Sequence, residues 1–90
     1  MRLMKRLVEL YKTQARLLWS WRGVPLGTSV EWRDLQGTHD VVAYDHTFAS
    51  TVMFEGGTYS FTFTRMGHYL YVCTLHEGAG MVGEIVVEAP

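Results

Sequence analysis

The stretch TYSFTFTRMGHYLYVC, residues 58–73, alternates apolar and polar side chains up to a short turn at residues 65–67 and then places tyrosines at every second position. In an extended chain, successive side chains point to opposite faces. The residues that would share one apolar face are Tyr59, Phe61 and Phe63 before the turn and Tyr69, Tyr71 and Cys73 after it. The stretch therefore predicts two consecutive strands that each bury one face.

A similar sequence pattern continues on both sides of this stretch, from Pro25 to the end of the chain. Short runs of β-branched and aromatic residues are punctuated by glycine, and no helical spacing of apolar residues recurs there. Regular short strands with frequent turns predict a mainly β domain, a small antiparallel sandwich or barrel. The predicted strands are residues 29–33, 39–44, part of 47–54, 58–64, 68–73 and 81–88. The expected core contains the alternating valines of the last strand and Trp32, Phe54, Tyr59, Phe61, Phe63, Tyr69 and Tyr71.

Residues 1–23 differ in composition from residues 24–90, which we expect to form the β domain. They hold six basic residues and one acidic residue, and their apolar residues recur with the period of one helix face. We therefore expect an amphipathic helix that ends near residues 21–23. It either packs its apolar stripe on the domain or lies as a basic anchor on an anionic membrane surface. Charges interrupt the apolar residues, so the segment shows no recognisable signal peptide and cannot span a bilayer.

The overall composition limits the classes of function. A chain of 90 residues with 48% hydrophobic content can bury one core. A net charge of −1 gives no global indication of nucleic-acid binding or of disorder. We expect a monomer that binds no nucleic acid.

The only cysteine lies in the segment CTLHEGAGM, residues 73–81, and cannot form an internal disulfide. If one strand ends at Cys73 and the next begins at Met81, the ends of the intervening loop converge, and its glycines permit a tight turn. Cys73, His76 and Met81 could then surround a single point. The alternative interpretation is a buried thiol with an incidental histidine nearby.

A fourth ligand would complete a set of two imidazoles, a thiolate and a thioether, which is typical of an electron-transfer copper site. His39 is the best placed histidine because it begins a predicted strand after the turn at residues 37–38. His46 lies in a polar turn, and His68 follows the glycine of another turn, so both are less well placed.

The chain resembles the plastocyanin-like cupredoxins, the blue (type 1) copper proteins that include plastocyanins and archaeal halocyanins. The resemblance covers about three quarters of the chain and is most specific in GAGMVG, preceded by the Cys-x-x-His spacing. The strings that carry it are GTSVEW (27–32), GTHDVVAYD (37–45), FEGGTYSFTFTRMGHYLYVC (54–73) and CTLHEGAGMVGEIVVE (73–88).

The resemblance implies a small antiparallel Greek-key β-sandwich of the cupredoxin type that binds one copper ion, Cu(I) or Cu(II). It implies that the metal ligands are His39, Cys73, His76 and Met81. It also implies a one-electron carrier whose redox partner proteins dock near His76, in an extracytoplasmic or membrane-associated location. The backbone N–H of Asp40 would point at the cysteine sulfur, and we expect the Asp40 carboxylate to accept a hydrogen bond from the Thr74 hydroxyl.

Three other functions compete with the electron carrier. A copper-binding or copper-delivery module without a redox partner would use the same ligands. An enzyme of the multicopper oxidase or nitrite reductase kind would need histidines beside the copper cysteine, where this chain has Val72 and Thr74, so we expect no enzyme. A metal-free interaction domain would leave the four donor side chains without a common role.

Overall fold

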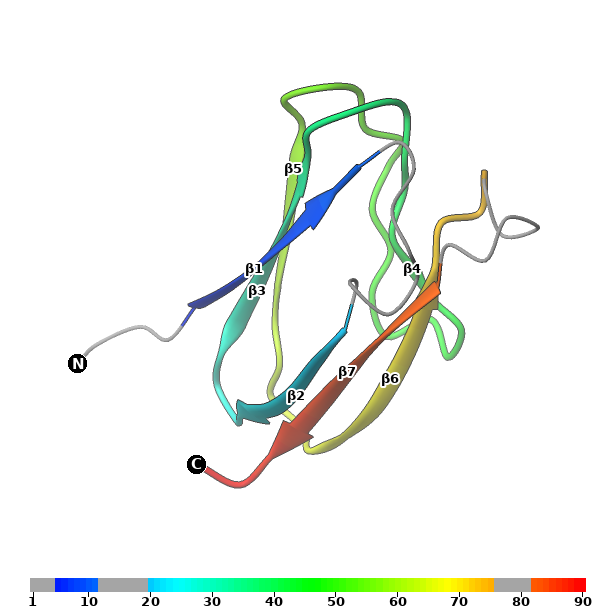
Figure 1. The fold of residues 1–90 in the computed structure, drawn as a ribbon. Helices are drawn as coiled ribbons and strands as arrows, with labels where there is room; N and C mark the ends of the chain where they lie inside the picture. Colours follow the sequence, from blue (N-terminus) through cyan, green and yellow to red (C-terminus); the bar gives the residue numbers. More distant parts are fainter. Residues whose placement is uncertain (1–4, 12–19, 76–81) are drawn as a thin grey trace.

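The computed structural model describes residues 5–11, 20–75 and 82–90, which form two β-sheets that face each other (Figure 1). One sheet has the strand order β1-β3-β5, and the other has the order β2-β7-β6-β4. The strands are β1 (Lys5–Leu10), β2 (Trp21–Pro25), β3 (Ser29–Asp34), β4 (Val42–Ala43), β5 (Thr58–Thr62), β6 (Gly67–Val72) and β7 (Val82–Glu88). The mainly β sandwich expected from the sequence is confirmed.

The two strands predicted from residues 58–73 are present as β5 and β6, but they belong to different sheets. β5 pairs antiparallel with β3, and β6 pairs antiparallel with β7. The turn at residues 65–67 therefore carries the chain from one sheet to the other. The expectation of a wholly antiparallel sandwich is wrong at two edges, because β1 is parallel to β3 and β2 is parallel to β7.

Aromatic side chains fill the space between the sheets. Trp32 is fully buried, and its ring centroid lies 5.2 Å from that of Phe48, 5.7 Å from that of Tyr59 and 5.4 Å from that of Tyr71. Tilted and edge-to-face arrangements at these distances are the ones that aromatic quadrupoles favour. Two sheets thus share a single core, as the predicted core residues on β3, β5 and β6 required.

The prediction that Phe54 belongs to the core is wrong. Phe54 is 67% exposed, whereas its neighbour Met53 is 5% exposed and belongs to the core cluster. Met53 pairs with His39 in an isolated antiparallel bridge, and in extended backbone the next side chain points the opposite way. Phe48, which was not among the predicted core residues, belongs to the core cluster.

The predicted N-terminal amphipathic helix is wrong. No helix occurs in the described ranges, and Lys5–Leu10 forms the edge strand β1 instead, paired with β3 from Lys5 opposite Ser29 to Leu10 opposite Asp34. Within these residues, burial alternates: Val8 and Leu10 lie in the core, and Glu9 between them is exposed. A short apolar run fits a helix or a strand locally, and pairing with β3 decides between them.

A side-chain contact joins the edges of the two sheets. The indole Nε1–H of Trp21 on β2 donates to the Leu7 carbonyl on β1 at 3.0 Å, and the Arg6 guanidinium lies 5.6 Å from the Trp21 ring centroid. These contacts occupy part of the exposed edge of β1, which would otherwise offer its backbone groups to another chain.

The described residues contain no helix of the length and apolar character needed to cross a membrane.

Candidate metal centre

His39 lies between β3 and β4 and is held through its backbone. Its N–H donates to the Met53 carbonyl at 3.1 Å, and the Met53 N–H donates to the His39 carbonyl at 2.7 Å. The side chain is 1% exposed, and its Nε2 lies 2.6 Å from the Gln36 carbonyl oxygen. A carbonyl oxygen can only accept, so Nε2 carries a proton, and the neutral form of this ring would have its lone pair on Nδ1.

Cys73 directly follows β6 and is fully buried, with its Sγ 3.9 Å from His39 Nδ1. The pairing of β4 with β6, Val42 opposite Val72, brings these two segments together although they are 34 residues apart. The ring nitrogen beside the sulfur is therefore the one that has the lone pair in the neutral tautomer. This is the donor chemistry that a soft metal ion requires from one imidazole and one thiolate.

The link expected between Asp40 and Thr74 is confirmed. The Thr74 N–H donates to Asp40 Oδ1 at 2.6 Å, and the Thr74 hydroxyl donates to Asp40 Oδ2 at 2.5 Å. Asp40 is buried. Since Asp40 follows His39 and Thr74 follows Cys73, this carboxylate ties together the two segments that carry the buried donors.

The other two predicted ligands, His76 and Met81, lie outside the described residues. Among the residues that the structure does describe, no group of three or more His, Cys, Asp or Glu side chains is arranged to hold a metal ion. The residues that flank the segment are placed, since Val72 pairs with Val82. Cys73 and Met81 each adjoin one member of this pair.

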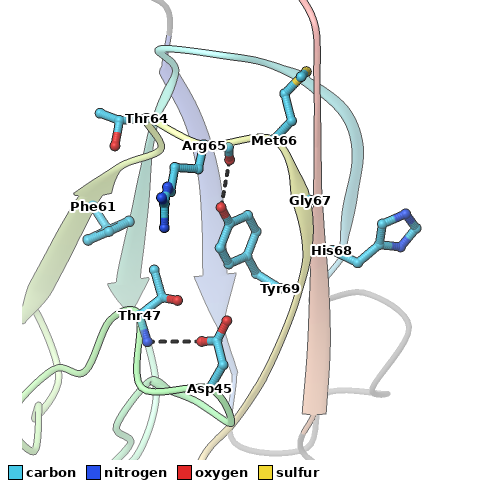
Figure 2. A pocket seen from close by; sticks show the side chains of 9 residues that line it. All are labelled: Asp45, Thr47, Phe61, Thr64, Arg65, Met66, Gly67, His68 and Tyr69. Carbon is cyan, nitrogen blue, oxygen red and sulfur yellow. Dashed lines mark hydrogen bonds between the residues drawn. The ribbon is translucent and has the colours of Figure 1, made fainter.

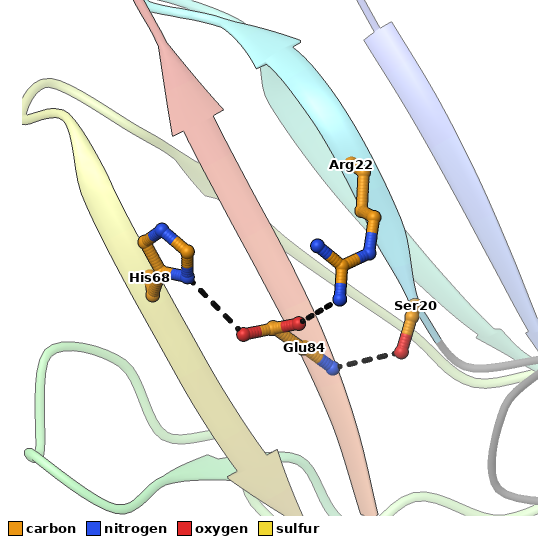
Figure 3. A network of polar contacts seen from close by, with 4 residues as sticks. All are labelled: Ser20, Arg22, His68 and Glu84. Carbon is orange, nitrogen blue, oxygen red and sulfur yellow. Dashed lines mark hydrogen bonds and ion pairs between the residues drawn. The ribbon is translucent and has the colours of Figure 1, made fainter.

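The two remaining histidines lie on the surface. His46 is exposed in a turn and has a positive φ of 65°. The Nδ1 of His68 lies 3.3 Å from the Glu84 carboxylate on the neighbouring strand β7 (Figure 3). The Glu84 carboxylate also accepts a hydrogen bond from Arg22, and the Glu84 backbone N–H donates to the Ser20 hydroxyl oxygen. Neither histidine belongs to the buried pair formed by His39 and Cys73.

Sequence reasoning missed a buried carboxyl close to the candidate centre. Asp34, at the end of β3, is fully buried, and both of its carboxyl oxygens are without a hydrogen-bond partner among the described residues. Burial raises the pKa of Asp34, and a positive charge on the protonated His39 ring and the nearby backbone of Gln36 would partly oppose this rise. No spacing signal could have identified it, because an acid at a strand end usually faces water.

A surface pocket lies away from these donors, between the turn at residues 45–47 and the start of β6 (Figure 2). Within it the Tyr69 hydroxyl donates to the Arg65 carbonyl at 2.6 Å, and the Thr47 N–H donates to the Asp45 carboxylate at 2.9 Å. No predicted metal ligand lines the pocket.

A two-sheet β-sandwich that buries a cysteine sulfur beside an imidazole nitrogen at its strand ends has two of the donor types of a cupredoxin-like copper protein. Comparison with known proteins leads to the same class. A family model described as copper binding proteins of the plastocyanin/azurin family matches residues 24–88. The chain belongs to this family, so its cofactor is one copper ion.

Individual relatives agree with the family match. Halocyanin from Natronomonas pharaonis is 44% identical over 71 residues, which cover 72% of this chain and 44% of the halocyanin. Plastocyanin from Chlamydomonas reinhardtii is 54% identical over 33 residues, which cover 37% of this chain and 23% of that protein. The chain thus spans less than half the length of these relatives.

Solved structures support the same fold. A variant of amicyanin in its Cu(I) form superposes with a TM-score of 0.76 at 29% identity, and the match covers 92% of this chain and 81% of the amicyanin. The recognition of a plastocyanin-like cupredoxin from sequence is therefore confirmed.

Proposed function

We propose that this protein is a type 1 copper protein that carries single electrons between redox partner proteins and is not an enzyme. The observation that carries the proposal is the buried contact of 3.9 Å between Cys73 Sγ and His39 Nδ1. With His76 and Met81, these residues would supply a thiolate, two imidazoles and a thioether to one ion. The pairing of Val72 with Val82 supports this set, because it fixes both flanks of the segment that contains His76 and Met81.

Copper, when bound, supplies a one-electron couple between Cu(I) and Cu(II). The protein's own residues determine how the donors are presented. The Gln36 carbonyl fixes the tautomer and orientation of the His39 ring. Burial of Cys73 excludes water and other thiols from the sulfur, which protects it from disulfide formation and oxidation.

The Asp40 carboxylate joins the two segments through two hydrogen bonds that do not involve the ion. A donor set that is held in place by the fold moves little when the charge of the ion changes. Little rearrangement then accompanies each electron, which is the condition for rapid transfer.

We place the docking site for redox partners around His76, and propose that the monomeric protein works outside the cytoplasm or at a membrane surface. The identity shared with halocyanin and plastocyanin supports this location, and the basic composition of residues 1–23 supports contact with a membrane surface.

The proposal is tested by voltammetry of the copper-loaded protein, combined with dialysis of both oxidation states against a copper chelator. A carrier gives one reversible one-electron wave and retains copper in both states. Cys73→Ser should abolish the wave, whereas His68→Gln, a surface change, should leave it unchanged. Loss of copper from one oxidation state of the unaltered protein would instead indicate a delivery module.

A further inference from the structure

We propose that β1 positions the His39 ring through a relay of backbone groups, and so acts on the copper site from outside residues 24–88, which the family model matches. The Leu10 carbonyl, at the end of β1, accepts hydrogen bonds from the N–H groups of Leu35 at 3.0 Å and Gln36 at 3.3 Å. The Gln36 carbonyl in turn accepts the Nε2–H of His39 at 2.6 Å. Three segments are thus joined in series.

The relay begins at a firmly held point. Leu10 is fully buried, and it is the last residue of the ladder between β1 and β3, opposite Asp34. The chain of β3 passes directly from Asp34 into Leu35 and Gln36. The hydrogen bonds to Leu10 therefore extend the contact between β1 and β3 into the loop that contacts the histidine.

The relay controls the ring of His39 more than its backbone. The backbone is held from the opposite side by two hydrogen bonds to Met53. These bonds leave the rotation of the imidazole free, and the bond from Nε2 to the Gln36 carbonyl restricts it. A hydrogen bond to the outer nitrogen of a ligand histidine orients the ring, and its loss typically weakens metal binding 10–100-fold, about the range expected here.

β1 lies outside residues 24–88, which the family model matches. The sequence of this strand can therefore change the orientation of a ligand without altering the family motif. The effect on copper rests on the proposed function, but the effect on the His39 ring does not.

The test compares Leu10→Ala with Val8→Ala. Both residues are buried on β1, and only Leu10 adjoins the relay. In the copper-free protein, NMR measures the exchange of the His39 Nε2 proton with water. We expect exchange about 10-fold faster in Leu10→Ala than in Val8→Ala at equal global stability, and a parallel loss of Cu(II) affinity of about 10-fold.

A second variant avoids a core cavity. Chemical synthesis with an ester in place of the amide of Leu35 removes the N–H that donates to Leu10 and keeps every side chain. It should also accelerate the exchange of the His39 proton. Unchanged exchange in both Leu10→Ala and the ester variant would overturn the relay. Faster exchange without any copper binding by the unaltered protein would leave the relay standing and overturn the proposed function.

Discussion

At the scale of single residues, the candidate centre depends on a few buried polar groups, and their partners differ in kind. His39 and Asp40 have backbone and side-chain partners that fix them. Asp34 is buried and its carboxyl oxygens have no hydrogen-bond partner in the described part of the chain. The first two residues should therefore stabilise the folded protein, and the third should destabilise it when ionised.

The link between Asp40 and Thr74 gives a prediction for the copper-free protein. Asp40→Ala removes the acceptor of two hydrogen bonds and should lower the free energy of unfolding by about 1–3 kcal/mol. Asp40→Asn is the matched control, since it keeps the shape and one acceptor oxygen and should recover part of the loss. Urea denaturation measures both. If Asp40→Ala were as stable as the unaltered protein, the link would have no structural role.

Asp34 gives a prediction with a defined dependence on pH. Its pKa is raised in the folded state by burial, so the native protein binds more protons at this site than the unfolded chain does. The stability that protonated Asp34 contributes is fully present below about pH 4. It is lost as the pH rises through the raised pKa, and the free energy of unfolding falls by up to ~1.4 kcal/mol per pH unit in that range. Asp34→Asn should remove this loss.

The measurement is the difference in unfolding free energy between Asp34→Asn and the unaltered protein at several pH values. Asp34→Asn should be the more stable protein at pH 7, and the difference should shrink towards pH 4. A difference that stays constant, or that grows at acidic pH, would show that Asp34 is not a buried acid with a raised pKa.

At the scale of elements, the alternation in residues 58–73 was sufficient to predict β5 and β6, because half-buried strands impose a period of two. The same reasoning failed at residues 5–10. Leu7, Val8 and Leu10 fit a helical stripe when the segment is read alone, yet β3 provides hydrogen bonds and a core that select the strand. This pairing joins residues about 24 positions apart, so it cannot be predicted from a local sequence pattern.

The candidate site shows the same contrast between features that a local sequence pattern predicts and features that only the folded chain creates. His39 and Cys73 could be brought together from sequence, because each lies at the end of a predicted strand and carries donor chemistry. The contributions of Asp34, Gln36 and Leu10 could not be predicted. Gln36 and Leu10 act through backbone carbonyls, which every residue type has, and the environment of Asp34 arises only when the sheets pack.

The attachment of β1 to β3 gives a prediction at this scale. The Glu31 carboxylate on β3 accepts hydrogen bonds from Lys5 Nζ at 2.8 Å and from the Arg33 guanidinium at 3.0 Å. These hydrogen bonds hold the pKa of Glu31 below its usual value. Ionised Glu31 therefore stabilises the folded protein at pH values above its pKa in the unfolded chain, and this stabilisation is lost as the pH falls through its lower pKa in the folded protein.

Glu31→Gln should therefore destabilise the protein at pH 7 by about 0.5–1 kcal/mol, a modest amount because Lys5 is 61% exposed and salt screens the pair. The loss should vanish in strong acid and decrease at high salt. Thermal unfolding at several pH values and salt concentrations measures it. A loss that persists unchanged in acid would mean that packing, and not charge, explains the effect.

At the scale of the whole molecule, two sheets place the ends of distant strands beside one another, and the buried core holds them there. Trp32 and its aromatic neighbours fill the sandwich, while the donors lie at the ends of the strands around it. The fold thus holds the sulfur and the imidazole side by side. A site formed in this way should bind copper without a large change in structure.

The central claim is that Cys73 and His39, together with His76 and Met81, hold one copper ion. Its most direct test is the visible spectrum of the purified protein during titration with Cu(II). We predict an intense thiolate-to-copper charge-transfer band that saturates at one ion per chain and is absent in Cys73→Ser. A colourless protein at saturation, with the Cys73 thiol still reactive after unfolding, would contradict the claim.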